Sequence, residues 1–313
     1  MRLKRRINLI LSGLAAAAVV LLAVLVAACY WMAGLVMHPP ANTEAQAETY
    51  PGFTKPIGNP KADLGLGYQE VSFETEDGLT IRAWYVPAAS ASIRSIIAVH
   101  GGRNDRRSFM PFLESWHRAS MNVLLIDARG HGTSDDDGFG LTLGLRESRD
   151  VRAAASWLRE ARSAERVGAI GASQGASAVL LASAGGAEID AVVVSSVGYD
   201  LARLFSLAVP GLPAPFRSMA ARMLLWRTGV PLPDALTLSY PQLEAARQLQ
   251  QPILFIHGSE DPVIHVDTVR HLFDQVPTTK RLWVIEGLKH QLPIAREPEE
   301  SLRQVTLFFD RNL

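Results

Sequence analysis

The pattern of hydrophobic and polar residues divides the chain into two contrasting parts. Residues 7–37 are apolar almost throughout, and this run exceeds the roughly 20 residues that cross a bilayer as a helix. From residue 67 onward, short apolar runs of strand length alternate with amphipathic stretches of helix length. Residues 38–66 between them are rich in proline, which favours extended, unpacked chain. The sequence therefore predicts a transmembrane anchor (1–37), a linker (38–66) and one globular domain (67–313).

The globular part is predicted to hold a mostly parallel sheet. Strands are expected at residues 68–74, 79–86, 95–99, 122–126, 166–170, 191–195, 253–257 and 281–286. Helices are expected at residues 108–118, 147–161, 176–182, 266–275 and 298–310. This alternation is typical of an α/β fold with helices on both faces of the sheet. Asp77-Gly78 indicates a hairpin turn, so the first two strands should add an antiparallel edge.

Residues 198 to about 250 interrupt the alternation. They are rich in leucine, methionine and phenylalanine, and six prolines interrupt them. Long insertions within compact domains are usually lids or binding segments. We expect a small helical cap over the active site, suited to a hydrophobic substrate group or to a membrane surface. The same apolar residues would also serve simply to pack such a cap onto the sheet.

The distribution of charges indicates how the chain would be oriented across a membrane. The 313 residues contain 31 basic and 31 acidic residues, so nothing in the balance points to a nucleic-acid partner. Four of the basic residues lie within the first six positions, and no lysine or arginine occurs between Met37 and Lys55. By the positive-inside rule, a single-pass chain would keep its N-terminus in the cytoplasm. The large globular domain would then lie on the non-cytoplasmic side, which is the periplasm if the protein is bacterial.

Cys29 is the single cysteine and lies inside the apolar run, so no internal disulfide or cysteine-based metal site is expected. Val26-Ala27-Ala28-Cys29 is similar to a bacterial lipobox, which would make the protein a lipoprotein anchored at Cys29. The alanine-rich part could also be cleaved as a secretory signal. The apolar run continues past Cys29 to Met37, where a mature chain normally begins with polar residues. This favours an uncleaved anchor.

Candidate chemistry begins at Gly171-Ala172-Ser173-Gln174-Gly175. A G-x-S-x-G sequence between a strand and a helix is the nucleophile elbow of α/β hydrolases. Its glycines permit a tight turn in which larger side chains would collide with the neighbouring strand and helix. The pattern alone is weak evidence, because it can arise by chance. A nucleophilic Ser173 would also need a base and an acid elsewhere in the chain.

His290 is the best candidate for the base. It follows the last predicted strand, where a loop residue can reach the carboxyl edge of the sheet. His271 falls on a predicted helix and suits a solvated helix face. His257 ends a strand just before a glycine and suits a structural role.

Asp261 is the best candidate for the orienting acid, since it follows the penultimate strand and precedes His290. The required order in this architecture is serine, then acid, then histidine. Glu260 is an immediate rival, but it would point away if Asp261 points in. Asp200 follows the preceding strand and also suits an ordinary position at the start of the cap.

The oxyanion of an acyl-transfer intermediate needs preorganised N–H donors. The backbone of Gln174, directly after the nucleophile, should supply one. We expect the second from Gly102 in the loop after the strand ending at Val99, with Arg103 as the alternative. His100 in the same loop suits a role in shaping the loop.

Taken together, these motifs make the sequence similar to the α/β-hydrolase superfamily, in its esterase/lipase/acyl-peptidase-like group. The similarity spans residues 68–310, and the motifs that carry it are His100-Gly101-Gly102, Asp127-x-Arg129-Gly130-His131-Gly132-x-Ser134, Gly171-x-Ser173-x-Gly175, His257-Gly258-x-x-Asp261-x-Val263 and His290. The resemblance implies a serine hydrolase that requires no cofactor or metal. It also implies that the Asp127–Ser134 stretch is a structural loop.

The leading hypothesis is a membrane-anchored serine hydrolase that cleaves a carboxylic ester or thioester through a Ser–His–Asp triad and an acyl-enzyme. Its substrate would be a small acyl compound, apolar if the cap contacts it. A serine peptidase or aminopeptidase on the same triad is an alternative. A non-catalytic interaction module on a hydrolase fold is a second one, because fold alone does not determine function.

Overall fold

The structure, a computed structural model, describes residues 2–38, 58–238, 240–290 and 292–313. Residues 39–57, which form most of the predicted linker, lie outside this part. The chain divides into two compact units. Among the described residues, 2–38 and 201–238 form a helical unit, and the others form an α/β unit.

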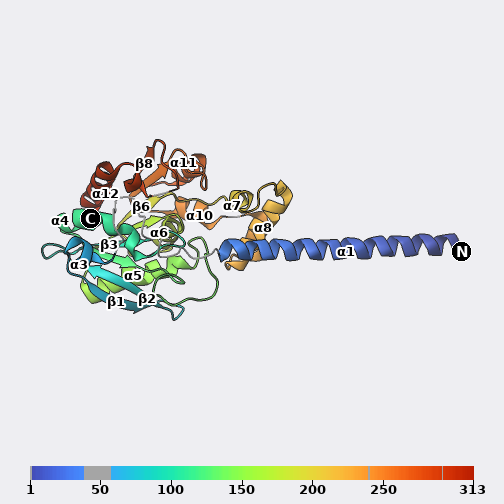
Figure 1. Cartoon of the computed structure of the whole chain (residues 1–313), viewed down its shortest axis with the longest axis horizontal. Coiled ribbons are helices and arrows are strands. Elements are labelled where there is room, and N and C mark those ends of the chain that lie inside the picture. The colour runs from blue at the N-terminus through green and yellow to red at the C-terminus, as the bar shows by residue number, and fades with distance from the viewer. Residues whose placement is uncertain (1, 39–57, 239, 291) are drawn as a thin grey trace. The chain divides into compact units, whose positions relative to one another are not determined.

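The α/β unit is built on one sheet, in which the described residues form eight strands ordered β1-β2-β4-β3-β5-β6-β7-β8 (Figure 1). The strands are β1 (Gln69–Glu74), β2 (Thr80–Val86), β3 (Arg94–Val99), β4 (Asn122–Ile126), β5 (Arg166–Ala172), β6 (Ala191–Ser195), β7 (Ile253–Gly258) and β8 (Lys280–Ile285). β2 pairs antiparallel with β1 and β4, whereas all other pairs are parallel. The prediction of a mostly parallel sheet with an antiparallel edge is confirmed.

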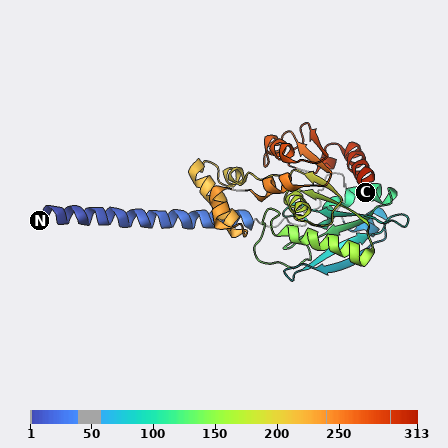
Figure 2. The same ribbon diagram turned by 180° about the vertical axis from the view of Figure 1, so that it is seen from behind.

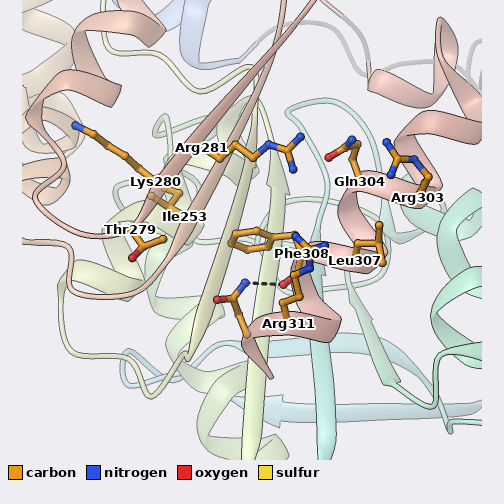
Figure 3. A pocket seen from close by; sticks show the side chains of 10 residues that line it. Ile253, Thr279, Lys280, Arg281, Arg303, Gln304, Leu307, Phe308 and Arg311 are labelled. Atoms are coloured by element: carbon orange, nitrogen blue, oxygen red, sulfur yellow. Dashed lines mark hydrogen bonds between the residues drawn. The ribbon is translucent and has the colours of Figure 1, made fainter.

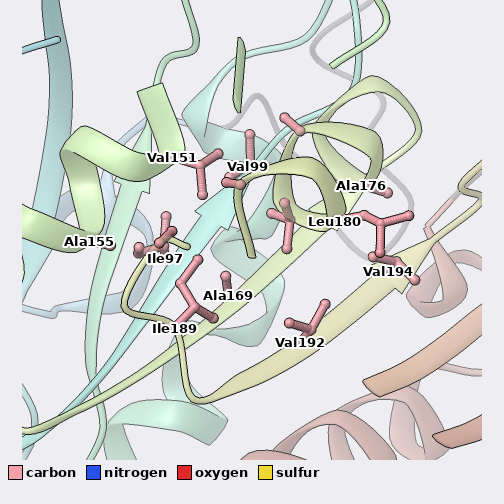
Figure 4. Close-up of a cluster of buried hydrophobic side chains, with 14 of the residues drawn as sticks. Ile97, Val99, Val151, Ala155, Ala169, Ala176, Leu180, Ile189, Val192 and Val194 are labelled. Carbon is pink, nitrogen blue, oxygen red and sulfur yellow. The ribbon is translucent and has the colours of Figure 1, made fainter. Parts of the chain in front are cut away.

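Helices cover both faces of the sheet, as predicted (Figures 1 and 2). Successive residues of β3 alternate between two hydrophobic clusters: Ile97 and Val99 belong to one, and Ile96 and Ala98 to the other. The helices on the Ile97 side are α5 (Glu147–Arg162), α6 (Gln174–Ala184), α10 (Pro241–Gln248) and α11 (Val266–Gln275). Figure 4 shows this cluster, with Val151 of α5 and Leu180 of α6 packed over β3, β5 and β6. The helical segments on the Ile96 side are η1 (Arg106–Phe112), α4 (Leu113–Arg118), η2 (Pro293–Ala295) and α12 (Pro298–Asn312).

Two segments of the α/β unit differ from prediction. The helix expected at 108–118 is split into the 3₁₀ helix η1 and the short α-helix α4. Pro111 lies inside η1 and has no N–H to donate to a preceding turn, so a regular α-helix cannot run through it. The linker was expected to be extended up to residue 66, but α3 (Pro60–Leu64) is helical because Asn59 caps its first N–H groups.

The helical unit contains α1 (Arg2–Met37), α7 (Leu201–Ala208), α8 (Ala214–Arg227) and α9 (Leu232–Thr237). α8 packs against α1, α7 and α9. The insertion is therefore helical, as predicted, but it is shorter than 198–250, because α10 packs on α6 and α11 of the α/β unit. The apolar span Asn8–Met37 of α1 includes an 18-residue window with a mean hydropathy of 2.9, which is compatible with a membrane-spanning helix and also with a signal sequence.

Candidate active site

Ser173 lies at a strained turn between β5 and α6. Its φ of 52° and ψ of −116° fall in a region that non-glycine residues rarely adopt. The turn is held because the Ser173 N–H donates to the Ser195 carbonyl at the end of β6, at 2.8 Å. A Cβ at Gly171 would lie 2.2 Å from the Gly175 carbonyl oxygen, and one at Gly175 would lie 2.3 Å from the His100 carbonyl oxygen. Both glycines are thus required by close backbone contacts, as the motif predicts.

The structure brings Ser173, His290 and Asp261 together in one hydrogen-bonded chain. His290 Nε2 lies 3.0 Å from Ser173 Oγ, and His290 Nδ1 lies 2.7 Å from Asp261 Oδ2. Ser173 and His290, 117 residues apart in the sequence, meet because β5, β7 and β8 run parallel and end at the same edge of the sheet. The Nδ1–H tautomer donates to the carboxylate, which leaves Nε2 free to accept the serine proton.

The surroundings of Asp261 keep its carboxylate ionised. The side chain is buried, which opposes the charge, but His290 and the N–H groups of Val263 and Ile264, at 2.8 and 2.9 Å from Oδ1, favour it. The balance lowers the pKa of Asp261 below its ordinary value. Of the rival acids, Glu260 and Asp200 are both exposed.

The other two histidines considered at the sequence level have different partners. His257 is buried, and its Nε2 lies 3.0 Å from the Ile264 carbonyl and 3.8 Å from Asp261 Oδ2. Burial lowers its pKa, so it is neutral and fixes the turn whose N–H groups contact Asp261. His271 lies on α11 and pairs through Nδ1 with the Tyr199 hydroxyl at 2.6 Å.

The loop after β3 borders the nucleophile. His100 is buried, its Nε2 accepts from the Ala128 N–H at 3.0 Å, and its Nδ1 lies 2.8 Å from the Gly101 carbonyl. Burial and the neighbouring His131 lower the pKa of His100 to about 4, so the ring is neutral at pH 7 and shapes the loop. The Arg103 N–H donates to His131 Nε2 at 3.1 Å. Because the Arg103 N–H is used in this hydrogen bond, Gly102 is the better candidate for the second oxyanion donor.

Gly102 and Gln174 are close to each other. A Cβ at Gly102 would lie 3.5 Å from the Gln174 side-chain oxygen, which is buried and has no hydrogen-bond partner among the described atoms. Gly101, which was not among the predicted site residues, also lies beside the nucleophile, since a Cβ there would lie 3.4 Å from Ser173 Cβ. Its place in the His-Gly-Gly motif was the available signal, since glycine is the residue that lets a backbone approach a nucleophile closely.

The loop after β4 is structural in its contacts. Asp127 accepts from the N–H groups of Arg106 and Thr133, at 2.9 and 3.0 Å. The guanidinium of Arg129 is buried and bonds Asp77, Asp137 and Asp150. These contacts join the β1–β2 turn, the loop and α5.

The described residues contain no group of three or more His, Cys, Asp or Glu residues placed to hold a metal ion. A pocket of about 410 Å³ is lined by Ile253, Lys280, Arg281, Arg303, Phe308 and Arg311 (Figure 3). Ile253 and Lys280 begin β7 and β8, so this pocket lies at the sheet edge opposite the one that carries Asp261.

The fold and the placing of Ser173 at a strand-to-helix turn are those of the α/β hydrolases. In agreement, the chain belongs to the Alpha/beta hydrolase family, whose model matches residues 96–304. Among curated proteins, it is 27% identical over 241 residues to the uncharacterized protein Rv2307c of Mycobacterium tuberculosis, covering 76% of this chain and 77% of that protein. It is 24% identical over 230 residues to the uncharacterized protein YfhR of Escherichia coli O157:H7, covering 71% and 73%.

Solved structures include esterases with the same fold. The esterase Pf2001 of Pyrococcus furiosus is 25% identical, with a TM-score of 0.65, over 84% of this chain and 99% of that one. A cold-adapted esterase from an Arctic intertidal metagenomic library is 20% identical, with a TM-score of 0.57, over 80% and 96%. The chain is therefore a hydrolase of the α/β family with esterase-like structural neighbours.

Proposed function

We propose that this protein is a membrane-anchored serine hydrolase that cleaves a carboxylic ester or thioester through an acyl-enzyme. The observation that carries the proposal is the continuous hydrogen-bonded chain from Asp261 through His290 to Ser173. A serine hydroxyl beside a histidine that a buried carboxylate orients is the arrangement of an activated nucleophile.

In the proposed reaction, Ser173 Oγ attacks the substrate carbonyl carbon while His290 Nε2 takes the hydroxyl proton. The tetrahedral oxyanion accepts hydrogen bonds from the backbone N–H groups of Gln174 and Gly102. Collapse breaks the bond to the leaving group, which receives the proton from His290. Water then attacks the acyl-enzyme, giving its proton to His290, and Ser173 leaves with that proton. Asp261 stays ionised throughout and stabilises the imidazolium.

A fluorophosphonate probe tests the assignment of the nucleophile. We expect the full-length protein to be labelled and Ser173→Ala to lose both labelling and hydrolysis, with kcat lower by roughly 10⁴-fold or more. Ser156→Ala, on the exposed side of α5, is the control and should be labelled as the wild type is. Labelling that persists in Ser173→Ala would contradict the assignment, and a wild type that is never labelled would favour a non-catalytic module.

The acyl group is proposed to be apolar, because the helical insertion is rich in leucine, methionine and phenylalanine. Hydrolysis of a series of p-nitrophenyl esters should be faster for medium or long acyl chains than for acetate. A strong preference for acetate would contradict this part of the proposal. Turnover of peptide amides alone would favour the peptidase alternative.

Membrane attachment is proposed to occur through uncleaved α1, with the N-terminus in the cytoplasm and the α/β unit on the other side. The 30-residue apolar span and the four basic residues before it support this orientation. N-terminal sequencing of the membrane fraction tests it. A mature chain that begins at Cys29 would replace this proposal with the lipoprotein alternative, and one that begins further on would indicate a cleaved signal.

A further inference from the structure

The C-terminal end of α1 is packed against α8. Cys29, Ala33 and Met37 are buried and four residues apart, so they form one stripe along the helix, whereas most large apolar residues from Leu9 to Val24 are exposed. The Arg227 guanidinium of α8 donates to the Tyr30 carbonyl at 2.9 Å and lies 4.3 Å from the centre of the Tyr30 ring. α8 is thereby fixed to the last turns of α1.

The length of α1 indicates the depth at which this contact lies. At about 1.5 Å per residue, the 30-residue apolar span measures about 45 Å, against about 30 Å for the hydrocarbon core. With the basic N-terminus at one interface, about ten residues extend beyond the core at the other end. Tyr30, which Arg227 contacts, is one of those residues. This depth suits Arg227, because a guanidinium is far more stable among headgroups than in hydrocarbon.

The helical unit also exposes large apolar side chains. Trp226 of α8 is 48% exposed, and Leu232 and Leu236 of α9 are 53% and 55% exposed. Trp31 of α1 is 66% exposed. Tryptophan beside leucine is typical of surfaces that lie in a membrane interface.

The charge of the insertion is also suited to a lipid surface. Residues 201–238 contain four arginines and one aspartate. Four further basic residues lie in the first six positions, so 23 of the 31 basic residues and 30 of the 31 acidic residues are left for the rest of the chain after residue 37. The insertion is therefore cationic within an otherwise acidic globular part, and cationic segments with exposed apolar residues bind anionic bilayers.

We propose that the surface formed by Trp226, Leu232 and Leu236 inserts into the headgroup region of the bilayer that α1 spans, where the arginines of α7 and α8 contact anionic lipid. This inference rests on the proposed membrane anchor. It makes the insertion a membrane-surface element that is held at the bilayer by its own packing on α1.

Depth-dependent quenching in proteoliposomes tests the proposal. In a Cys29→Ala background of the full-length protein, a fluorophore is attached at Leu232→Cys, Leu236→Cys, Leu14→Cys or Ser156→Cys. The vesicles contain phosphatidylglycerol and lipids with a nitroxide either at the headgroup or deep in the acyl chain. We expect the headgroup nitroxide to quench positions 232 and 236, the deep nitroxide to quench position 14, and neither to quench position 156.

The outcomes separate the two proposals. Quenching at 14 without quenching at 232 and 236 would leave the anchor in place and overturn the surface insertion. An absence of quenching at 14 would overturn the anchor and the surface insertion with it. Vesicles without phosphatidylglycerol should give weaker quenching at 232 and 236, and quenching of equal strength would overturn the role of the arginines. Thermal unfolding of each variant confirms that it is folded.

Discussion

At the scale of single residues, position 175, two residues after Ser173, has no room for any side chain. Its Cα faces the backbone of β3, where a Cβ would lie 2.3 Å from the His100 carbonyl oxygen and 2.4 Å from that of Val99. No side-chain rearrangement relieves a contact with strand backbone. Because β3 also leads into the loop that borders Ser173, displacing it would move the Gly102 N–H as well.

Gly175→Ala is therefore expected to destabilise the protein by about 2 kcal/mol or more and to reduce hydrolysis. Gly67→Ala is a matched control, since a Cβ there has no atom within 4 Å and its backbone is not left-handed. Denaturant unfolding of both variants measures the difference. Equal unfolding midpoints would show that the elbow accommodates a methyl group and would refute the packing argument.

At the scale of elements, the loop between β3 and η1 depends on a neutral histidine. His100 accepts from Ala128 at the end of β4 and bonds Gly101 within its own loop, so its ring links two adjacent strands. An unfolded histidine has a pKa near 6.5, while burial lowers that of folded His100 to about 4. Protonation therefore favours the unfolded chain, and the stability due to His100 is complete above pH 6.5 and is lost as the pH falls toward 4.

We expect acidification from pH 7 to pH 4 to reduce the free energy of unfolding by about 3 kcal/mol through His100 alone. His257, whose pKa burial also lowers, should add to the loss in the same direction. Urea unfolding at a series of pH values measures the slope. His100→Gln should flatten it, and a variant that keeps the full wild-type slope would contradict the assignment to His100.

At the scale of the whole molecule, α1 has two different surfaces along its length. Its C-terminal end packs on α8 through the buried residues Cys29, Ala33 and Met37, whereas Ala18 is exposed in the middle of the apolar span. The same substitution should therefore have different effects at these two positions. A larger side chain at 33 would push α8 away, and one at 18 would remain exposed.

Ala33→Leu is expected to loosen α7–α9, and Ala18→Leu is not. Limited trypsin digestion of the protein in proteoliposomes measures this, because Arg217 and Arg222 are cleavable positions within α8. Cleavage should be severalfold faster in Ala33→Leu than in the wild type. Equal rates in both variants would indicate that the contact between α1 and α8 adds little stability.

The sequence allowed prediction of those features that depend on local pattern and chain order. The strands of the sheet, the elbow at Ser173 and the loops of Asp261 and His290 follow from apolar runs, glycine positions and the order of the motifs. The break at Pro111 and the cap at Asn59 were missed because each depends on one residue within a longer favourable pattern. The grouping of 201–238 with α1 could not be predicted, because nothing local in either segment indicates its distant partner.

The 117 residues between Ser173 and His290 also set the order in which the site is made. The ribosome adds about 5–20 residues per second, so Ser173 emerges roughly ten seconds before the histidine that would activate it. During that time α1 and the whole insertion have been synthesised, but β8 and its loop have not. If the proposed triad is correct, a nascent chain at this stage carries α1 and its nucleophile yet cannot hydrolyse a substrate. Activity would begin only when β8 and the loop that carries His290 have joined the sheet.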